Sequence, residues 1–150
     1  MRESISMMVV SDEYMIMNQL KGIAEVNSVP VIGVRTSEAI REMNKEMAHI
    51  VIVVQTDVNI SVEIVQMLKS INPNALILFV AYDSDFSLLR NMTRAGIDEF
   101  YVFPEESKLF SSRLPNIIES YARKKTGRTQ SAVTGFGRGR GKTISFYSIL

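Results

Sequence analysis

Five short apolar segments alternate with longer stretches that repeat apolar residues at helical spacing, and this alternation constrains the fold most. The clearest segment, HIVIVV at residues 49–54, is apolar on both faces, as expected of a central strand in a parallel sheet. The predicted strands are residues 5–10, 29–34, 49–54, 75–81 and 99–103. Strands that alternate with helices form a parallel sheet covered on both faces, so the sequence predicts a three-layer α/β fold.

A helix is predicted after each of these strands. The helices are expected to begin at Ser11, at Thr36 or Ser37, at Ser61, at Asp83 and at Glu105. Gly96 is expected to end the fourth helix in a left-handed conformation. The fifth helix should extend to residue 125, and Pro115 should kink or split it, because proline donates no backbone hydrogen bond.

Charge divides the chain into two parts. All 16 acids and ten of the 17 basic residues lie at or before Glu119, which gives this part a net charge of −6. The remainder carries seven basic residues and no acid, a charge of +7. The sequence therefore predicts an acidic domain over residues 1–125 and a basic, glycine-containing segment over residues 126–150.

Several classes of function are excluded or disfavoured by composition. The chain has no cysteine and a single histidine, His49, so it offers neither a disulfide framework nor a zinc site. No apolar run approaches the roughly 20 residues of a membrane span. We expect a cytoplasmic protein without a transmembrane segment and without a resident cofactor or metal.

Two motifs indicate a family. The run AGIDEFYVFP at residues 95–104 resembles the A-G-A-D-D-Y-L-V-K-P signature of response-regulator receiver domains, the CheY-like family. The run VVSD at residues 9–12 resembles the first strand of that family with its acidic pair. The resemblance covers residues 5–125 and implies the flavodoxin/CheY-like (βα)5 fold, with parallel strand order 2-1-3-4-5.

The family's chemistry defines which positions matter. A receiver domain transfers a phosphoryl group to an aspartate after the third strand, and two acids after the first strand hold Mg²⁺. A Ser or Thr after the fourth strand and a Lys after the fifth bind the phosphoryl oxygens. In this chain Ser11 replaces one acid beside Asp12, Val80 falls at the hydroxyl position, and Phe103 precedes Pro104 where the lysine is expected.

The phosphoacceptor position also lacks a carboxylate. It holds Val54, Gln55 or Thr56, depending on a small gap, and Asp57 follows in the loop beyond. The resemblance therefore implies a pseudo-receiver that cannot be phosphorylated by the usual route. Phe103 is interpreted as filling the vacant pocket with carbon, or else as an ordinary core aromatic at a strand end. The Phe103–Pro104 bond is expected to be cis.

The basic segment contains the end of a phosphate-binding loop. Its matching residues are Gly139, Gly141, Lys142 and Thr143. They resemble the deviant loop of MinD/ParA-type ATPases, although the first lysine and the middle glycine of that loop are missing. The alternative is a disordered Arg/Gly tail. Because 150 residues leave no room for the rest of a nucleotide-binding domain, this chain is not expected to be an enzyme, while a longer protein would bind ATP and Mg²⁺.

The order of the parts, a degenerate receiver followed by a basic linker and a MinD/ParA-like loop, is similar to the TadZ/CpaE-like proteins of Flp (tight adherence) pilus assembly. This resemblance implies a module for protein–protein interaction, dimerisation and localisation at a cell pole. The implied partners are a second copy of the chain and proteins of pilus assembly or polar localisation.

The same resemblance places a homodimer interface on the fourth helix, fifth strand and fifth helix. Its candidate residues are Arg90, Arg94, Asp98, Tyr101, Lys108 and Arg113. An ordinary solvated surface is the alternative reading of these charges. Two other functions stay open: a signalling receiver that uses Asp57 as an unorthodox phosphoacceptor, and a nucleic-acid binder that uses the Arg/Gly tail. No specific nucleic acid is expected.

Overall fold

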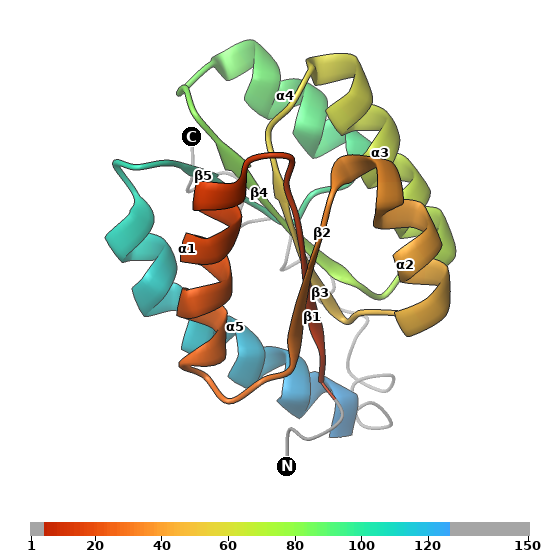
Figure 1. Ribbon diagram of the computed structural model, residues 1–150, viewed down its shortest axis with the longest axis vertical. Coiled ribbons are helices and arrows are strands. Elements are labelled where there is room, and N and C mark those ends of the chain that lie inside the picture. Colours follow the sequence, from red (N-terminus) through yellow and green to blue (C-terminus); the bar gives the residue numbers. More distant parts are fainter. Residues whose placement is uncertain (1–4, 127–150) are drawn as a thin grey trace, which may run out of the picture.

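Five parallel strands form one sheet in the order β2-β1-β3-β4-β5, which confirms the predicted fold class (Figure 1). The computed structural model describes residues 5–126. The strands are β1 (Met7–Val10), β2 (Val31–Val34), β3 (Ile50–Val54), β4 (Leu76–Ala81) and β5 (Glu99–Val102). Each is one or two residues shorter than the apolar segment that predicted it.

Helices cover both faces of the sheet. The helical elements are α1 (Tyr14–Glu25), the short 3-10 turn η1 (Thr36–Glu38), α2 (Ala39–Glu46), α3 (Val58–Ile71), α4 (Phe86–Ala95) and α5 (Ser107–Thr126). Helices α1 and α5 pack on one face, and α2, α3 and α4 pack on the other. Within the described residues, no helix is long and apolar enough to span a membrane.

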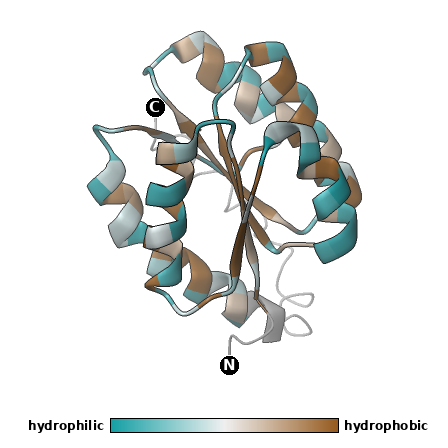
Figure 2. Cartoon of the chain, viewed as in Figure 1, coloured by the Kyte–Doolittle hydropathy of each residue, from teal (hydrophilic) through white to brown (hydrophobic). Residues whose placement is uncertain are grey.

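The sheet separates two hydrophobic cores. One joins alternate strand residues such as Val53 and Phe79 to α2, α3 and α4. The other joins the intervening strand residues to α1 and α5, where Phe110, Leu114 and Ile118 form a fully buried stripe one turn apart. Figure 2 shows these apolar strands running through the centre of the molecule, between helices whose outer surfaces are more hydrophilic.

The strands end in register, which brings five loops together. Val10 pairs with Val34 and with Val53, Val54 pairs with Val80, and Ala81 pairs with Val102. Because all strands are parallel, the loops that follow them meet at the carboxyl edge of the sheet. Ligands of open α/β sheets bind at this edge, so a ligand-binding or phosphorylation site of this fold is expected here.

Four predicted helix starts need correction, because α1, α3, α4 and α5 begin at Tyr14, Val58, Phe86 and Ser107 rather than at Ser11, Ser61, Asp83 and Glu105. Helix α3 begins at Val58 rather than Ser61, because the Asp57 side chain accepts hydrogen bonds from Asn59 N and Ile60 N and caps the helix earlier. Pro115 does not split α5, which is continuous from Ser107 to Thr126. Gly96 ends α4 with φ of 122°, as predicted.

Candidate functional site

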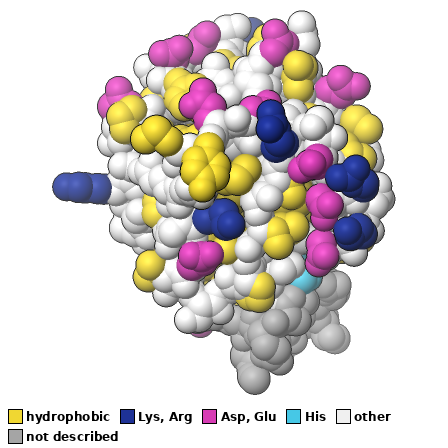
Figure 3. Space-filling view, viewed as in Figure 1, with side chains coloured by type: hydrophobic (Ala, Val, Ile, Leu, Met, Phe, Trp, Pro, Cys, Tyr) yellow, Lys and Arg dark blue, Asp and Glu magenta, His cyan; other side chains and the backbone are white. Residues whose placement is uncertain are grey.

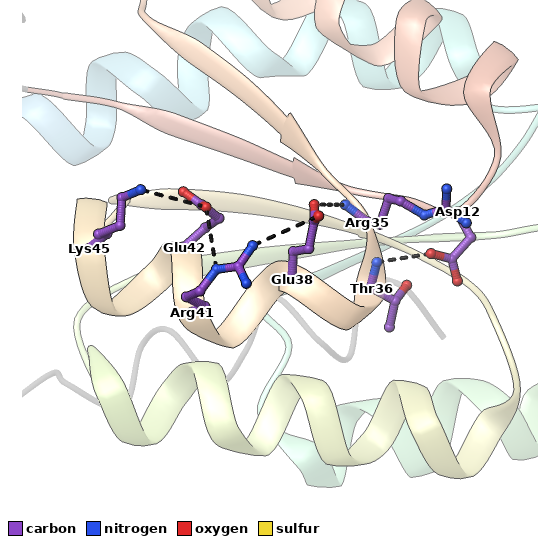
Figure 4. A network of polar contacts seen from close by, with 7 residues as sticks. All are labelled: Asp12, Arg35, Thr36, Glu38, Arg41, Glu42 and Lys45. Carbon is purple, nitrogen blue, oxygen red and sulfur yellow. Dashed lines mark hydrogen bonds and ion pairs between the residues drawn. The ribbon is translucent and has the colours of Figure 1, made fainter.

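The two residues after β1 are held by backbone contacts. Ser11 is 1% exposed, and its Oγ donates to the Glu13 carbonyl while accepting the Glu13 N–H, both at 3.0 Å. Asp12 is exposed, and its Oδ1 accepts the backbone N–H of Thr36 at 2.9 Å. Figure 4 shows the Asp12 carboxylate directed at the start of η1, next to an ion-pair network along α2. Asp12 therefore ties β1 to the β2–α2 connection.

Each candidate acceptor after β3 also has a structural role. Val54 is 1% exposed in the core shared with α1 and α5. The Gln55 side chain accepts the backbone N–H of Tyr82 at 2.8 Å, which joins the ends of β3 and β4. The backbone N–H of Thr56 donates to Ser61 Oγ at 3.1 Å. Asp57, the nearest carboxylate, is the N-cap of α3.

Val80, which lies inside β4, and Phe103, which directly follows β5, are apolar and buried. Phe103 is 2% exposed and lies in the same core as Val54 and Val80. Its ring meets the ring of Phe110 nearly edge-on, with centroids 5.6 Å apart. The Phe103–Pro104 peptide bond is cis, as predicted. Phe103 is thus a core aromatic at the end of a strand, which was one of the two readings of the sequence.

Sequence reasoning missed two residues at this edge, Glu13 and Tyr82. Burial raises the pKa of the Tyr82 phenol, and the negative charge of Glu13 together with a hydrogen bond to it raises that pKa further. This contact links the β1–α1 loop to the β4–α4 loop across the end of β3. The adjacent acids Asp12 and Glu13 were the available signal in the sequence.

Asp12 and Asp57 are the carboxylates that the sequence analysis considered at this edge of the sheet. Within residues 5–126, no three Asp, Glu or His side chains lie close enough together to hold a metal ion. Asp12 and Asp57 each use one carboxylate oxygen to accept backbone N–H groups. The expectation that the chain holds no metal ion therefore stays a prediction.

The predicted interface residue Tyr101 is not on the surface, and this expectation was wrong. Tyr101 is 2% exposed and packs edge-on against Phe110, with ring centroids 5.1 Å apart. Its hydroxyl donates to Glu99 Oε1 at 2.7 Å and accepts from Arg113 Nε at 3.0 Å. Arg113 also pairs with Glu99 at 3.0 Å. Strand alternation explains the error, because Tyr101 faces α5 rather than solvent.

The other predicted interface residues divide into two groups. Asp98 accepts the backbone N–H of Ile77 at 2.8 Å and pairs with Lys69 at 3.3 Å, so it satisfies the edge of β4 within the chain. Arg90, Arg94 and Lys108 are exposed. Arg90 lies over the ring of Phe86, 5.4 Å from its centroid.

A groove of about 300 Å³ lies beside these residues, between β4, β5 and α5. Leu76, Leu78 and Ile117 form its apolar floor. Its polar rim is made by Asp98, Glu99, Arg113, Asn116 and Ser120. The surface between β4, β5 and α5 is therefore hollowed and carries both charge signs, which suits contact with another protein more than with a small apolar ligand.

Replacing Tyr101 with phenylalanine tests the Glu99–Tyr101–Arg113 contacts. We expect Tyr101→Phe to lower the free energy of unfolding by about 1–2 kcal/mol, because Glu99 and Arg113 each lose a partly buried partner. Burial raises the pKa of Tyr101, and Glu99 raises it further, against a smaller opposing effect of Arg113. The pKa of Tyr101 is thus higher in the folded protein than in the unfolded chain, where it is about 10. Its contribution to stability is therefore complete below about pH 10 and decreases as the pH rises further.

The difference in the free energy of unfolding between wild type and Tyr101→Phe should therefore be constant from about pH 7 to 9 and become smaller above about pH 10. Urea denaturation at several pH values measures it. Leu109→Ala, at a position 45% exposed on the same helix, is the control, and its effect should not vary with pH. An unchanged difference at high pH would contradict the contacts described.

The phosphate-loop residues predicted in the basic segment, Gly139, Gly141, Lys142 and Thr143, lie outside the described residues. The same holds for the linker up to Leu150, apart from the helical residue Thr126. Both therefore stay predictions.

Comparison with known proteins identifies the fold. No protein-family model and no curated protein matches the chain. Among solved structures, a response regulator from Thermotoga maritima is similar with a TM-score of 0.69 and 20% identity, over 77% of this chain and 98% of that one. A pilus assembly-related protein from Burkholderia pseudomallei is similar with a TM-score of 0.64 and 16% identity, over 83% of this chain and 93% of that one. A CheY-like protein (TadZ) from Pseudomonas aeruginosa is similar with a TM-score of 0.62 and 14% identity, over 78% of this chain and 92% of that one.

Proposed function

Because the chain has the fold of CheY-like receiver domains, we propose that it is a receiver-like interaction module that accepts no phosphoryl group. In this proposal it serves dimerisation and localisation of a pilus-assembly protein. It acts in the cytoplasm, at a cell pole, without a cofactor and without catalysing a reaction.

The end of β3 carries the proposal. Phosphoryl transfer to a receiver needs a free carboxylate there, with a metal ion to neutralise the developing charge. Val54 is buried, Gln55 holds Tyr82, and Asp57 accepts two backbone N–H groups at the start of α3. A carboxylate used as a helix cap is also a weaker nucleophile, because the hydrogen bonds stabilise its charge.

The residue that follows β5 supports the same proposal. A buried ammonium without a charged partner is costly, so a site that lost its anion no longer favours lysine after β5. Phe103 fits that requirement, since it packs against Phe110 in the core that holds Val54 and Val80. The changes at the separate strand ends are physically consistent with one another.

The role in pilus assembly is supported by the order of parts in the sequence and by the two similar structures described as pilus assembly-related and as TadZ. At 16% and 14% identity these similarities establish only the fold. The role in pilus assembly is supported by the order of the parts in the sequence and by a receiver-like scaffold whose surface can bind other proteins.

A charge reversal on α4 tests dimerisation. In the proposed homodimer, the exposed Arg90, Arg94 and Lys108 and the groove beside β5 lie in the interface. Arg94→Glu should raise the dimer dissociation constant by about 10-fold or more, because a favourable charge contact becomes a repulsive one at both symmetric positions. Sedimentation velocity at several protein concentrations measures the shift from dimer to monomer.

Lys21→Glu, on α1 at the other side of the sheet, makes the same change of charge and is the matched control. It should sediment as the wild type does. Equal sedimentation of wild type, Arg94→Glu and Lys21→Glu would exclude the α4-β5-α5 face as the dimer interface.

A further inference from the structure

Exposed hydrophobic side chains concentrate at the carboxyl edge of the sheet. Of the eleven large hydrophobic residues exposed in the described part of the chain, seven lie there. Six of them occupy the first turns of four helices: Tyr14, Met15, Val58, Ile60, Phe86 and Leu109. The seventh, Tyr82, directly follows β4. We call these seven residues the apolar collar; Met15, Tyr14 and Phe86 are 83%, 76% and 59% exposed.

The collar is surrounded by acids. The loops that follow the five strands contain one basic residue, Arg35, and seven acidic ones. The acids are Asp12, Glu13, Asp57, Asp83, Asp85, Glu105 and Glu106. The loops at the opposite edge, between a helix and the next strand, contain a single acid, Asp98, and no Lys or Arg. The negative charge is therefore polarised toward the edge that carries the collar.

The two kinds of side chain lie next to one another. The charge of Glu13 raises the pKa of Tyr82, so the loops after β1 and β4 approach one another over the end of β3. Figure 3 shows acidic and hydrophobic side chains intermingled along the upper part of the visible face, where the strands of Figure 1 end. Apolar groups that remain exposed beside charges are typical of a surface that binds a partner.

The chemistry of this surface selects its ligand. Its acids repel nucleic acids and anionic lipid surfaces, which both require basic patches. Its aromatic and methionine side chains gain nothing from a hydrated cation, but they bury well against aliphatic side chains. A helix with Lys or Arg on one side and Leu or Ile on the other satisfies both requirements.

We propose that the carboxyl edge of the sheet, formed by the apolar collar and its acids, is a docking surface for a basic amphipathic helix of a partner protein. This inference rests on the proposed function, since a site engaged in phosphoryl transfer would have to stay open to Mg²⁺ and to a phosphodonor. The surface adjoins the α4-β5-α5 face at the first turns of α4 and α5, where Arg90 lies over the ring of Phe86.

The test uses the full 150-residue chain and a fluorescent synthetic helical peptide with lysines on one face and leucines on the other. Fluorescence anisotropy measures binding, and a scrambled peptide of the same composition without an apolar face is the peptide control. We expect the amphipathic peptide to bind about 10-fold or more tightly than the scrambled one. Equal binding of both peptides, or no binding of either, would overturn the proposal.

Two pairs of variants locate the contact. Met15→Ser with Phe86→Ser removes apolar groups from the collar, and Val26→Ser with Met67→Ser removes exposed apolar groups elsewhere. Asp83→Asn with Glu105→Gln removes edge charges, and Glu25→Gln with Glu46→Gln removes the same charge from the far ends of α1 and α2. Each collar or edge pair should weaken binding by about 10-fold or more, and each control pair should leave it unchanged. Equal losses within a matched pair would refute the site.

The basic segment of this chain is the competing occupant. If Arg138→Glu with Arg140→Glu strengthens peptide binding about 10-fold or more, the chain's own segment covers the edge, and the proposal of a foreign helix is wrong. Unchanged binding supports it. If the peptide does not bind while wild type still dimerises through α4, the docking surface fails and the proposed function stands.

Discussion

Replacing Phe103 with lysine, the residue that the receiver family carries there, is expected to destabilise this protein severely. The side chain is 2% exposed and lies among Val54, Val80 and Phe110. An ammonium in that position would be desolvated without a charged partner, at a cost of about 3 kcal/mol or more in the free energy of unfolding. Urea denaturation followed by circular dichroism measures the loss.

The loss should depend on pH in a defined direction. Burial lowers the pKa of an introduced lysine, so the stability of Phe103→Lys should recover as pH rises and the amine becomes neutral in the folded protein. Phe103→Leu is the control, with a cost of about 1.5 kcal/mol or less and no such recovery. A stable Phe103→Lys protein would contradict the account, since it would mean that the pocket still offers carboxylates to a cation.

Truncation of Phe110 to alanine should have the second large effect. The ring is fully buried and meets both Tyr101 and Phe103 edge-on, at centroid distances of 5.1 and 5.6 Å. Its removal should lower the free energy of unfolding by about 3–5 kcal/mol through lost burial and a cavity between α5 and the sheet. Thermal and urea unfolding measure this change.

Phe110→Leu, which retains most of the volume, should lose only about 1–1.5 kcal/mol. Leu109→Ala, at the neighbouring exposed position, should change the free energy of unfolding by about 0.5 kcal/mol or less. A loss below about 1 kcal/mol for Phe110→Ala would show that the aromatic contacts do not hold α5 on the sheet.

The fold was predictable because its signals are local and repeated. The buried run at residues 50–54 identifies a central strand, and Gly96 marks a helix end that needs a positive φ. Boundaries were less predictable, since they depend on side-chain hydrogen bonds. Asp57 moved the start of α3 by capping it, and Asp98 satisfies the edge of β4 in place of a strand residue.

The candidate site was predictable only in outline. Its positions follow from the strand ends, whereas the direction of each side chain depends on contacts between distant residues. Asp12 holds Thr36, 24 residues away, and the buried Tyr101 accepts a hydrogen bond from Arg113 of α5. The apolar collar was not recognised from sequence at all, because Tyr14 and Met15 lie in α1 and Phe86 lies in α4, and only the sheet brings these two helices to one edge.

Intact-mass spectrometry after incubation with acetyl phosphate and Mg²⁺ tests the central claim most directly. A receiver with a working site gains the mass of one phosphoryl group on a carboxylate, and a known response regulator serves as the positive control. We predict that this chain gains no mass, because Asp57, the nearest carboxylate after β3, caps α3, and Phe103 after β5 is buried in the core. A gain of one phosphoryl group that disappears in Asp57→Asn would contradict the account.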